Sequence, residues 1–450
     1  MSKPQQDDDS GALIERLARD EIDHLWVVYT DYNGRSQGKS IPRSRFDATA
    51  RRGITFARAN LGHNLTDHAP ADTMFGADSG DFFAGPDPTA YMPYPLLPAT
   101  GRVMCWMRQE GGAPWDGCPR TALKRQIDAY SARGLRLQAA FEPEGYLFQL
   151  APDGEPAPAV PPGMFSVAAL ETEAELLHRI SDTLEAMGID VEQIAPEWGP
   201  GQFEVNLRHA APMRAADNLV AMKDVVRALA RQAGLLASFM PKPRETLGGC
   251  GLHVHLSLWD ERGQSVTEGN DHPSGLSPTA AACLAGILAH ARALVGVGAP
   301  TVNSYKRLLP GSWAPAHAAY AVGNRSALAR IPGGARRRIE FRAGDNMSNP
   351  YLFLTALLAA GLDGIDRGLS LGAPAEGDLG HLSPAALAEQ GIALLPRTAG
   401  EALAAVAADE VVMDALGPVI GPEWLRVKRS ELDTYDTVVS PWEREAYLRG

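Results

Sequence analysis

Cysteine is scarce in this chain of 450 residues. The four cysteines are Cys105, Cys118, Cys250 and Cys283. No pair has the Cys-x-x-Cys spacing of a zinc or redox site, so the sequence predicts reduced thiols and a cytoplasmic location. The longest apolar run, residues 351–362, is too short to span a bilayer. Residues 1–10 lack a hydrophobic signal core and are predicted to form a disordered, solvated tail.

Basic residues are also fewer than acidic residues. Lys and Arg number 42 against 54 Asp and Glu, which gives a formal net charge of −12. Since no long basic run interrupts this acidic balance, we expect no nucleic-acid partner and no binding to anionic membranes. Neither a Walker A motif nor a Gly-x-Gly-x-x-Gly fingerprint follows a predicted strand, so the two commonest phosphate-binding loops are excluded.

The remaining sequence is typical of a globular protein of more than one domain. We expect a first domain over residues 11–110 and a second over residues 111–450, because Pro-rich and Gly-rich segments lie near the boundary. The clearest helix is predicted over residues 217–234, with Asp217 as its N-cap. Further helices are expected at residues 11–23, at 120–134, from Asn349-Pro350 onward, and as several short helices within 377–450.

Four segments alternate polar and apolar residues, as strands with one buried face do. They are residues 140–148, 202–207, 252–258 and 336–342. Their polar positions are Glu142 and Glu144, then Gln202, Glu204 and Asn206, then His253, His255 and Ser257, and finally Arg336, Arg338, Glu340 and Arg342. One interpretation is simply the solvated face of an antiparallel sheet. However, carboxylates two residues apart repel each other, so we favour a site that holds cations.

The residue types on this face specify the chemistry further. Glu197 and Glu204 flank a Trp-Gly-Pro-Gly-Gln turn that brings the two carboxylates together. Oxygen ligands favour Mg²⁺ or Mn²⁺ over zinc or copper. Arginines suit the oxygens of a transferred phosphoryl group and clamp carboxylates. Those nearest the polar strands are Arg307, Arg325, Arg330, Arg338 and Arg342. The pattern therefore indicates a metal-assisted ATP site on an antiparallel sheet.

Seven ordered segments resemble the glutamine synthetase superfamily, and the resemblance extends from about residue 20 to the C-terminus. The segments are FEPEGYLF (141–148), PEWGPGQFEVNL (196–207), FMPKP (239–243), GCGLHVHLSL (249–258), PTVNSYKRLLPG (300–311), GNRSALARIP (323–332) and RRIEFR (337–342). The resemblance implies an α+β fold, with an N-terminal β-grasp domain and a catalytic domain whose curved antiparallel sheet is flanked by helices. It also implies a homo-oligomer, a dodecamer of two stacked hexamers, with active sites at subunit interfaces.

The resemblance further implies ATP, L-glutamate and two to three Mg²⁺ or Mn²⁺ ions. By motif position, the ligands of the first metal are Glu144, Glu197 and Glu204, and those of the second are Glu142, His253 and Glu340. The residues that contact nucleotide are His255, Ser257, Arg330 and Arg338. Those that hold glutamate are Gly249, Arg307 and Arg342. Arg325 faces the transferred phosphoryl group, and Arg325, Glu340 and Arg307 are the expected catalytic residues. The implied reaction forms γ-glutamyl phosphate, which a nitrogen nucleophile then attacks.

The departures from the family pattern gather where ammonium-using members bind their nucleophile. Ala57 stands where those members have an aspartate, Met164 where they have a tyrosine, and Trp313 where they have the flap glutamate. An apolar substituent on nitrogen gains from burial against such residues, whereas a cation does not. We therefore predict a glutamate–amine ligase that uses a hydrophobic aryl or alkyl primary amine and forms a γ-glutamylamide.

Several alternatives stay open at this point. The chain could make γ-glutamylpolyamines or a γ-glutamylethanolamide, it could be a true glutamine synthetase that uses ammonia, or it could be a catalytically silent structural relative. An alkylamine must lose a proton before it attacks, and the candidate bases are His63, Asp67 and His317. Trp313 and Met164 have a plain structural interpretation too, as side chains that only pack beneath loops.

Overall fold

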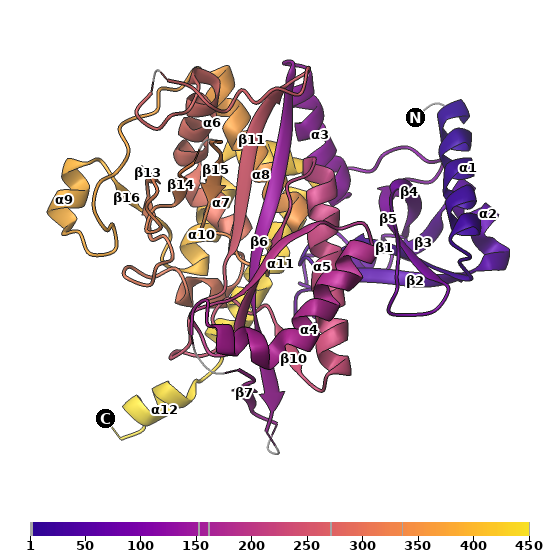
Figure 1. The fold of residues 1–450 in the computed structure, drawn as a ribbon, viewed down its shortest axis with the longest axis horizontal. Helices are drawn as coiled ribbons and strands as arrows, with labels where there is room; N and C mark the ends of the chain where they lie inside the picture. Colours follow the sequence, from indigo (N-terminus) through magenta and orange to yellow (C-terminus); the bar gives the residue numbers. More distant parts are fainter. Residues whose placement is uncertain (1–2, 152–153, 161–162, 271, 335, 450) are drawn as a thin grey trace.

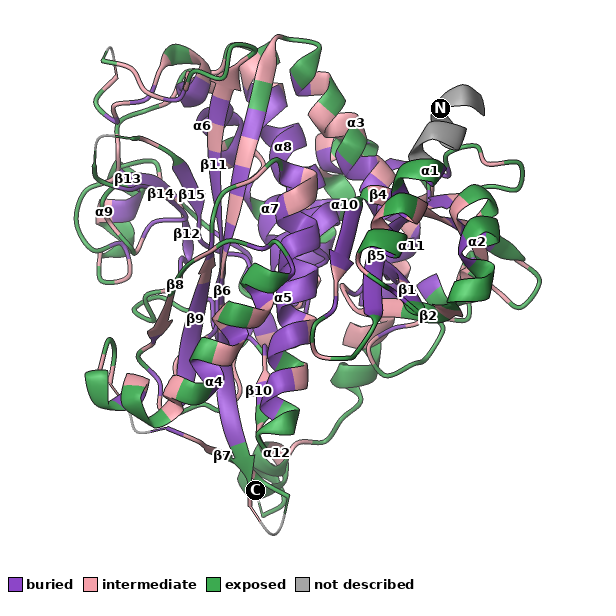
Figure 2. Ribbon diagram, turned by 45° about the vertical axis from the view of Figure 1, so that its right-hand side comes forward, coloured by how far each residue is buried: buried purple, intermediate pink, exposed green. Residues whose placement is uncertain are grey.

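The computed structural model describes residues 3–449, apart from 152–153, 161–162, 271 and 335 and the side chains of residues 3–9. It has a mixed α+β fold in which a small sheet near the N-terminus adjoins a larger, curved sheet flanked by helices (Figure 1). The predicted fold class is thus confirmed. Buried residues gather where the helices meet the large sheet, while the outer faces of the first two helices are exposed (Figure 2).

The small sheet has the strand order β2-β1-β5-β4-β3, with β1 parallel to β5 and all other neighbours antiparallel. Its strands are β1 (His24–Thr30), β2 (Ser36–Pro42), β3 (Ile54–Ala57), β4 (Asp81–Pro93) and β5 (Thr100–Arg108). Helices α1 (Lys3–Arg19) and α2 (Phe46–Arg52) pack against each other and against β4. Residues 3–10 are therefore helical where the sequence predicts a disordered tail, and the Ser10 hydroxyl anchors them by donating to the Ala50 carbonyl (3.1 Å).

The large sheet has the order β13-β14-β15-β11-β6-β9-β8, and two short strands, β7 and β10, also pair with β6. Its strands are β6 (Leu135–Leu150), β7 (Pro156–Pro158), β8 (Val191–Pro196), β9 (Gln202–Leu207), β10 (Leu236–Ser238), β11 (Leu252–Asp260), β13 (Tyr320–Val322), β14 (Ala329–Ile331) and β15 (Ile339–Phe341). Three of the alternating segments form strands as predicted. The fourth is shorter, because only Ile339–Phe341 pair with β11 and β14, so Arg336 and Arg338 precede the strand.

Helices cover the large sheet, and α8 (Pro350–Asp366) lies at their centre, in contact with α3, α6 and α11. The others are α3 (Pro119–Ser131), α4 (Val167–Ala186), α5 (Pro212–Gln232), α6 (Pro278–Ala289), α7 (Ala291–Gly298), α9 (Pro384–Glu389), α10 (Ala399–Ala408), α11 (Glu410–Asp436) and α12 (Pro441–Tyr447). Helix α8 begins at Pro350 as predicted, and Asn349 caps it, since its side-chain oxygen accepts from the backbone N–H of Tyr351 (2.9 Å). Among the described residues, no single helix is long and apolar enough to cross a membrane. Within the described chain, α6 and α7 have the required length and apolar composition only when they are taken together, and a 75° bend separates them.

The C-terminal segment contains several helices, as the sequence predicts, and the longest of them, α11, consists of two helices that meet at a kink. Helix α11 spans 27 residues across a kink at Gly417. The φ of Gly417 is 85°, a backbone conformation that glycine adopts without steric cost. Pro418 follows directly, in the first turn after the bend, where its missing N–H breaks no helical hydrogen bond. The Gly-Pro pair therefore ends one helix and begins the next.

The prediction that Asp217 caps α5 is wrong. The helix begins five residues earlier, at Pro212, and Asp217 lies inside it with 2% of its surface exposed. Its carboxylate pairs with the Arg120 guanidinium and accepts from the Tyr351 hydroxyl (2.6 Å). Arg120 also pairs with Asp87 of β4 (2.5 Å). A buried arginine of α3 thus ties the small sheet to α5 and α8, which explains why a carboxylate is tolerated there.

Replacing Arg120 by methionine tests this network. The substitution leaves two buried carboxylates without their cation, so we expect the free energy of unfolding to fall by about 3–5 kcal/mol. Denaturation by urea, followed by tryptophan fluorescence, measures the change. Arg133→Met is the matched control, because the Arg133–Asp366 ion pair is largely exposed and contributes about 0–1 kcal/mol. Equal losses for the two variants would contradict the assignment.

Candidate active site

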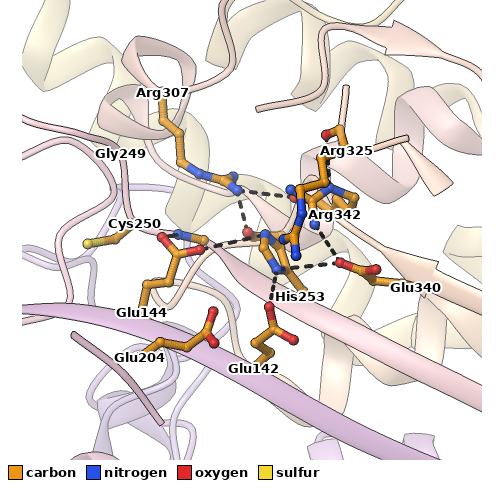
Figure 3. A network of polar contacts seen from close by, with 12 residues as sticks. Glu142, Glu144, Glu204, Gly249, Cys250, His253, Arg307, Arg325, Glu340 and Arg342 are labelled. Atoms are coloured by element: carbon orange, nitrogen blue, oxygen red, sulfur yellow. Dashed lines mark hydrogen bonds and ion pairs between the residues drawn. The ribbon is translucent and has the colours of Figure 1, made fainter. Parts of the chain in front are cut away.

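Glu142 lies on the polar face of the large sheet and contacts two histidines, one of which, His253, is shown beside it in Figure 3. Strands β6 and β11 pair so that Glu142 is opposite His253. One oxygen of Glu142 contacts Nδ1 of His253 and the other contacts Nε2 of His255, each at 3.0 Å. Arg338 donates to Nδ1 of His255 (3.0 Å), so Nε2 of that ring carries its proton toward Glu142. Although burial opposes it, these two histidine contacts hold the pKa of Glu142 far below its usual range.

Glu340 is the most enclosed acid of the site, with none of its surface exposed. It lies on β15 opposite His255, and its two oxygens contact the guanidinium groups of Arg330 and Arg342 at 2.5 Å each. Burial alone would raise its pKa, but the charges of His253 and Arg342 lower it to about 2. Glu340 is therefore a fully ionised acid that the protein itself neutralises.

Two of the other three carboxylates, Glu197 and Glu204, lack such compensation. Glu144 of β6 lies directly opposite Glu204 of β9, and Glu197 follows β8 on the other side of the Gly-Pro-Gly turn. Burial, together with repulsion from Glu142 and Glu144, raises the pKa of Glu204 to about 10. Burial and repulsion from Glu144 raise the pKa of Glu197 to about 7. These acids would ionise together readily only with cations among them.

The donor set fits divalent metal ions. Two groups each bring three ligand atoms within 4.8 Å of one another, namely Glu142, Glu204 and His253, and Glu142, His255 and Glu340. Both groups share Glu142. These groups differ from the two ligand sets that the sequence predicts. Glu204, predicted for the first metal, lies with His253, which is predicted for the second. His255, predicted to contact nucleotide, belongs to the other group. Glu144 is also close, with its oxygen 3.7 Å from Nε2 of His253. Carboxylate-rich groups of this kind suit Mg²⁺ or Mn²⁺.

A glycine loop lets a buried arginine approach the acids. A Cβ atom on Gly249 would lie 2.5 Å from the Arg307 side chain, and one on Gly251 would lie 2.6 Å from its guanidinium. Arg307 donates to the carbonyl oxygens of Gly344 (3.2 Å) and Arg342 (3.1 Å). The structure thus brings together Gly249, Arg307 and Arg342, the three residues predicted to bind glutamate.

Two cavities meet at Arg325. The first cavity, about 550 Å³, contains most of the predicted metal and nucleotide residues. Its lining includes Glu142, Glu197, Glu204, His255, Ser257, Arg330 and Arg338. The second cavity, about 400 Å³, also includes Arg325 in its lining, together with other residues from 310–317, 324–326 and 377–381. Among the described residues, Arg325 is the one that lines both of these cavities.

The three residues predicted to line an amine pocket are not brought together in one chain. Trp313 lines the second cavity, is 68% exposed and has a φ of 63°, which is unusual for a bulky residue. Met164 lines neither cavity, and its neighbour Phe165 lines the first one instead. Ala57 ends β3 in the small sheet and lines neither cavity.

The candidate bases are also separated. His317 is buried and lines the second cavity. His63 contacts the Ala59 carbonyl through Nδ1 (2.7 Å), and Asp67 forms an ion pair with Arg35 (2.8 Å), so both belong to the region of the small sheet. Within this chain, only His317 of the three lies on a cavity wall beside Arg325.

The sequence also left two positioning residues unassigned. Gln202 donates to Glu144 and to the Gly249 carbonyl, each at 3.0 Å, and so joins an acid to the glycine loop. Asn346 donates to the backbone carbonyls of Glu144 (2.9 Å) and Gly251 (3.1 Å). The signal for Gln202 was present, because it shares a strand face with Glu204. Asn346 lies in a loop, where no periodicity marks it.

Comparison with known proteins gives consistent matches over nearly the whole chain. The family model "Glutamine synthetase, catalytic domain" matches residues 116–447. A glutamine synthetase from Halobacterium salinarum is 34% identical over 449 residues, which is 98% of this chain and 97% of that one. A glutamate–methylamine ligase from Methyloversatilis universalis is 35% identical over 445 residues, 96% and 97% of the two chains.

A solved structure supports the same relationship. A GmaS/ADP complex, in its conformation 1, superposes with a TM-score of 0.86 at 32% identity, covering 97% of this chain and 99% of that one. The match therefore includes the small sheet as well as the large one. Together with the acids, histidines and arginines gathered on one sheet face, these matches show that the chain belongs to the glutamine synthetase family.

Proposed function

We propose that the protein joins the γ-carboxylate of L-glutamate to a hydrophobic primary amine at the expense of ATP, through γ-glutamyl phosphate. The observation that carries this proposal is the second cavity beside Arg325. Trp313, Ala314 and Ala316 contribute apolar wall there, and Asp378 is the single acid among its described lining residues. Such a wall favours an amine with an apolar substituent over ammonium. The relatives named glutamate–methylamine ligase and GmaS support the same choice.

The residues of the first cavity are suited to the phosphoryl step. We propose that Arg307 and Arg342 hold the carboxylates of glutamate, and that Arg325, Arg330 and Arg338 face the phosphates of ATP. Fixed guanidinium groups stabilise the charge that develops on phosphoryl oxygens, without reorganisation during the reaction. The five acids and two histidines on the sheet would hold two to three Mg²⁺ or Mn²⁺ ions, which supply further positive charge when bound.

We also propose that the protein assembles into the ring-shaped oligomer of its family, a dodecamer with active sites between subunits. Two observations support an interface. Ala57, predicted to border the amine, lines neither cavity of its own chain, as expected if it serves a neighbouring subunit. In addition, large apolar side chains near the C-terminus are exposed, which favours burial against another chain. They are Val438, Val439, Trp442, Tyr447 and Leu448.

A panel of nucleophiles tests the proposed reaction. Purified protein with ATP, Mg²⁺ and L-glutamate should release phosphate faster with methylamine, ethylamine or aniline than with ammonium chloride, because the second cavity rewards apolar substituents. Mass spectrometry of the products should detect the corresponding γ-glutamylamide. The fastest release with ammonium would identify a glutamine synthetase, and the fastest release with putrescine a polyamine ligase. Either result would reject the proposal.

The metal site makes a separate prediction. Adding Mn²⁺ to the nucleotide-free protein should raise its thermal unfolding midpoint, since saturation at about 100 times Kd contributes roughly 2.7 kcal/mol. Glu204→Gln removes a ligand and also relieves repulsion from Glu142 and Glu144. This variant should therefore be at least as stable as the wild type without metal, yet lose most of the metal-induced increase. Glu185→Gln, on the exposed side of α4, is the control for loss of one charge. An undiminished increase in Glu204→Gln would contradict the assignment.

The flap residue tests selectivity. Trp313→Glu places an anion at the wall of the second cavity and removes apolar surface, so kcat/KM for ammonium relative to methylamine should rise by about tenfold or more, which corresponds to about 1.4 kcal/mol. Steady-state phosphate release with each nucleophile measures the ratio. Trp313→Gln removes the same ring without adding charge and should shift the ratio much less. Equal shifts would show that charge at this position does not select the nucleophile.

A further inference from the structure

The second cavity is a built site, because hydrogen bonds between two loops hold its wall. The Asn324 side chain donates to the Gly377 carbonyl (2.7 Å), and the Leu379 backbone N–H donates to the Ser326 hydroxyl (3.1 Å). These contacts fix residues 377–381 against the segment that carries Arg325. The wall of this cavity therefore has a defined shape beside Arg325.

His317 is the buried polar side chain of this cavity. It is 3% exposed, and it lies on the two-residue strand β12 (His317–Ala318), which pairs with β16 (Ala393–Leu394). The adjacent hydrogen bond from the Leu395 N–H to the Ala316 carbonyl (3.0 Å) extends this pairing. The backbone is thus held firmly, yet no described residue hydrogen-bonds to the imidazole ring. A buried imidazole without a protein partner, on a cavity wall, is available to a ligand.

The protonation state of His317 suits it to accept a proton. Burial, together with the nearby charge of Arg397, lowers its pKa from the usual value, so the ring is neutral at neutral pH. The other histidine of the cavity differs. The ring of His381 is 72% exposed, and its Nδ1 contacts Asp378 (3.0 Å). Of the two, only His317 offers a ring that is both enclosed and unpartnered.

The charges around the cavity favour a neutral amine over its ammonium form. Arg325 contributes a positive charge at the boundary with the first cavity. The two oxygens of Asp378 are engaged by His381 and by the Gly380 backbone N–H (3.1 Å). Like charge and desolvation both lower the pKa of a bound ammonium group. The same arrangement offers no free acid for the second ammonium group of a polyamine.

We propose that His317 is a catalytic residue that takes the proton an alkylammonium substrate must lose, and that the cavity admits mono-amines with a compact apolar substituent. This inference rests on the proposed function. The proton moves from nitrogen to the imidazole, and the nitrogen lone pair then forms the C–N bond with the γ-carbon. The C–O bond to phosphate breaks, and phosphate leaves with the electron pair. The surplus proton on nitrogen goes to the departing phosphate, and His317 returns its own proton to solvent.

The test compares two nucleophiles that differ in protonation. Methylamine is almost wholly protonated at neutral pH, whereas hydroxylamine is mostly neutral and needs no base. In His317→Asn and His317→Ala, kcat/KM for methylamine should fall by about 100-fold or more. With hydroxylamine, the same variants should keep their rate to within about fivefold. The asparagine variant keeps a polar side chain in the pocket, so its folding is the less disturbed.

Controls separate the possible outcomes. His178→Ala, on the exposed face of α4, should keep both rates, and thermal unfolding midpoints verify that each variant is folded. Equal losses with both nucleophiles in a folded variant, or no loss with methylamine, would overturn the role of His317. The panel of nucleophiles is measured first on the wild type. If that protein used ammonium alone, the proposed function would fail, and this inference with it. If the wild type used amines, the rates of the His317 variants would decide whether His317 is the base.

Discussion

The repulsion among five carboxylates on one sheet face is the constraint around which the site is organised. Within the chain itself, Arg330 and Arg342 neutralise Glu340, and two histidines contact the carboxylate of Glu142. They leave Glu197 and Glu204 uncompensated, and the raised pKa values of these two acids record that imbalance. The protein thus fixes the geometry of all five acids while supplying positive charge for only some. A divalent cation binds where such a balance is incomplete.

The fold can hold this arrangement because most of the acids come from long or closely paired strands. The register between β6 and β11 continues over nine residue pairs, from Leu252 with Pro143 to Asp260 with Leu135. Slippage by one residue would turn every acid toward the core, so burial of the opposite apolar face fixes the polar one. Glycine at positions 249 and 251 then admits Arg307, which no side chain there would allow. Packing on one face of the sheet therefore determines electrostatics on the other.

The sequence predicted what periodicity encodes and missed what loops and distant pairs encode. Alternation located Glu142, Glu144, Glu204, His253 and His255, because a strand side chain has only two possible faces. Asp217 was misread, since a helix cap and a buried ion pair use the same residue type, and only the structure reveals Arg120 beside it. Met164 and Phe165 lie in a loop without periodicity, so the sequence could not indicate that Phe165 lines the first cavity and Met164 does not. The second cavity is lined by segments about 60 residues apart in the sequence, so no local sequence pattern could predict it.

On the proposed function, two separate cavities would let one family accommodate different nucleophiles. The first cavity is built largely from paired strands, where a substitution disturbs register, charge balance and core together. The second is built from loops at residues 310–317 and 377–381, which border the reacting centre only through Arg325. Loops tolerate substitution better than strands do. The relatives named glutamine synthetase and glutamate–methylamine ligase are 34% and 35% identical to this chain. Such similar identities are compatible with a shared arrangement of acids and arginines on the sheet. The phosphoryl chemistry can stay constant while the loops determine which nitrogen reaches it.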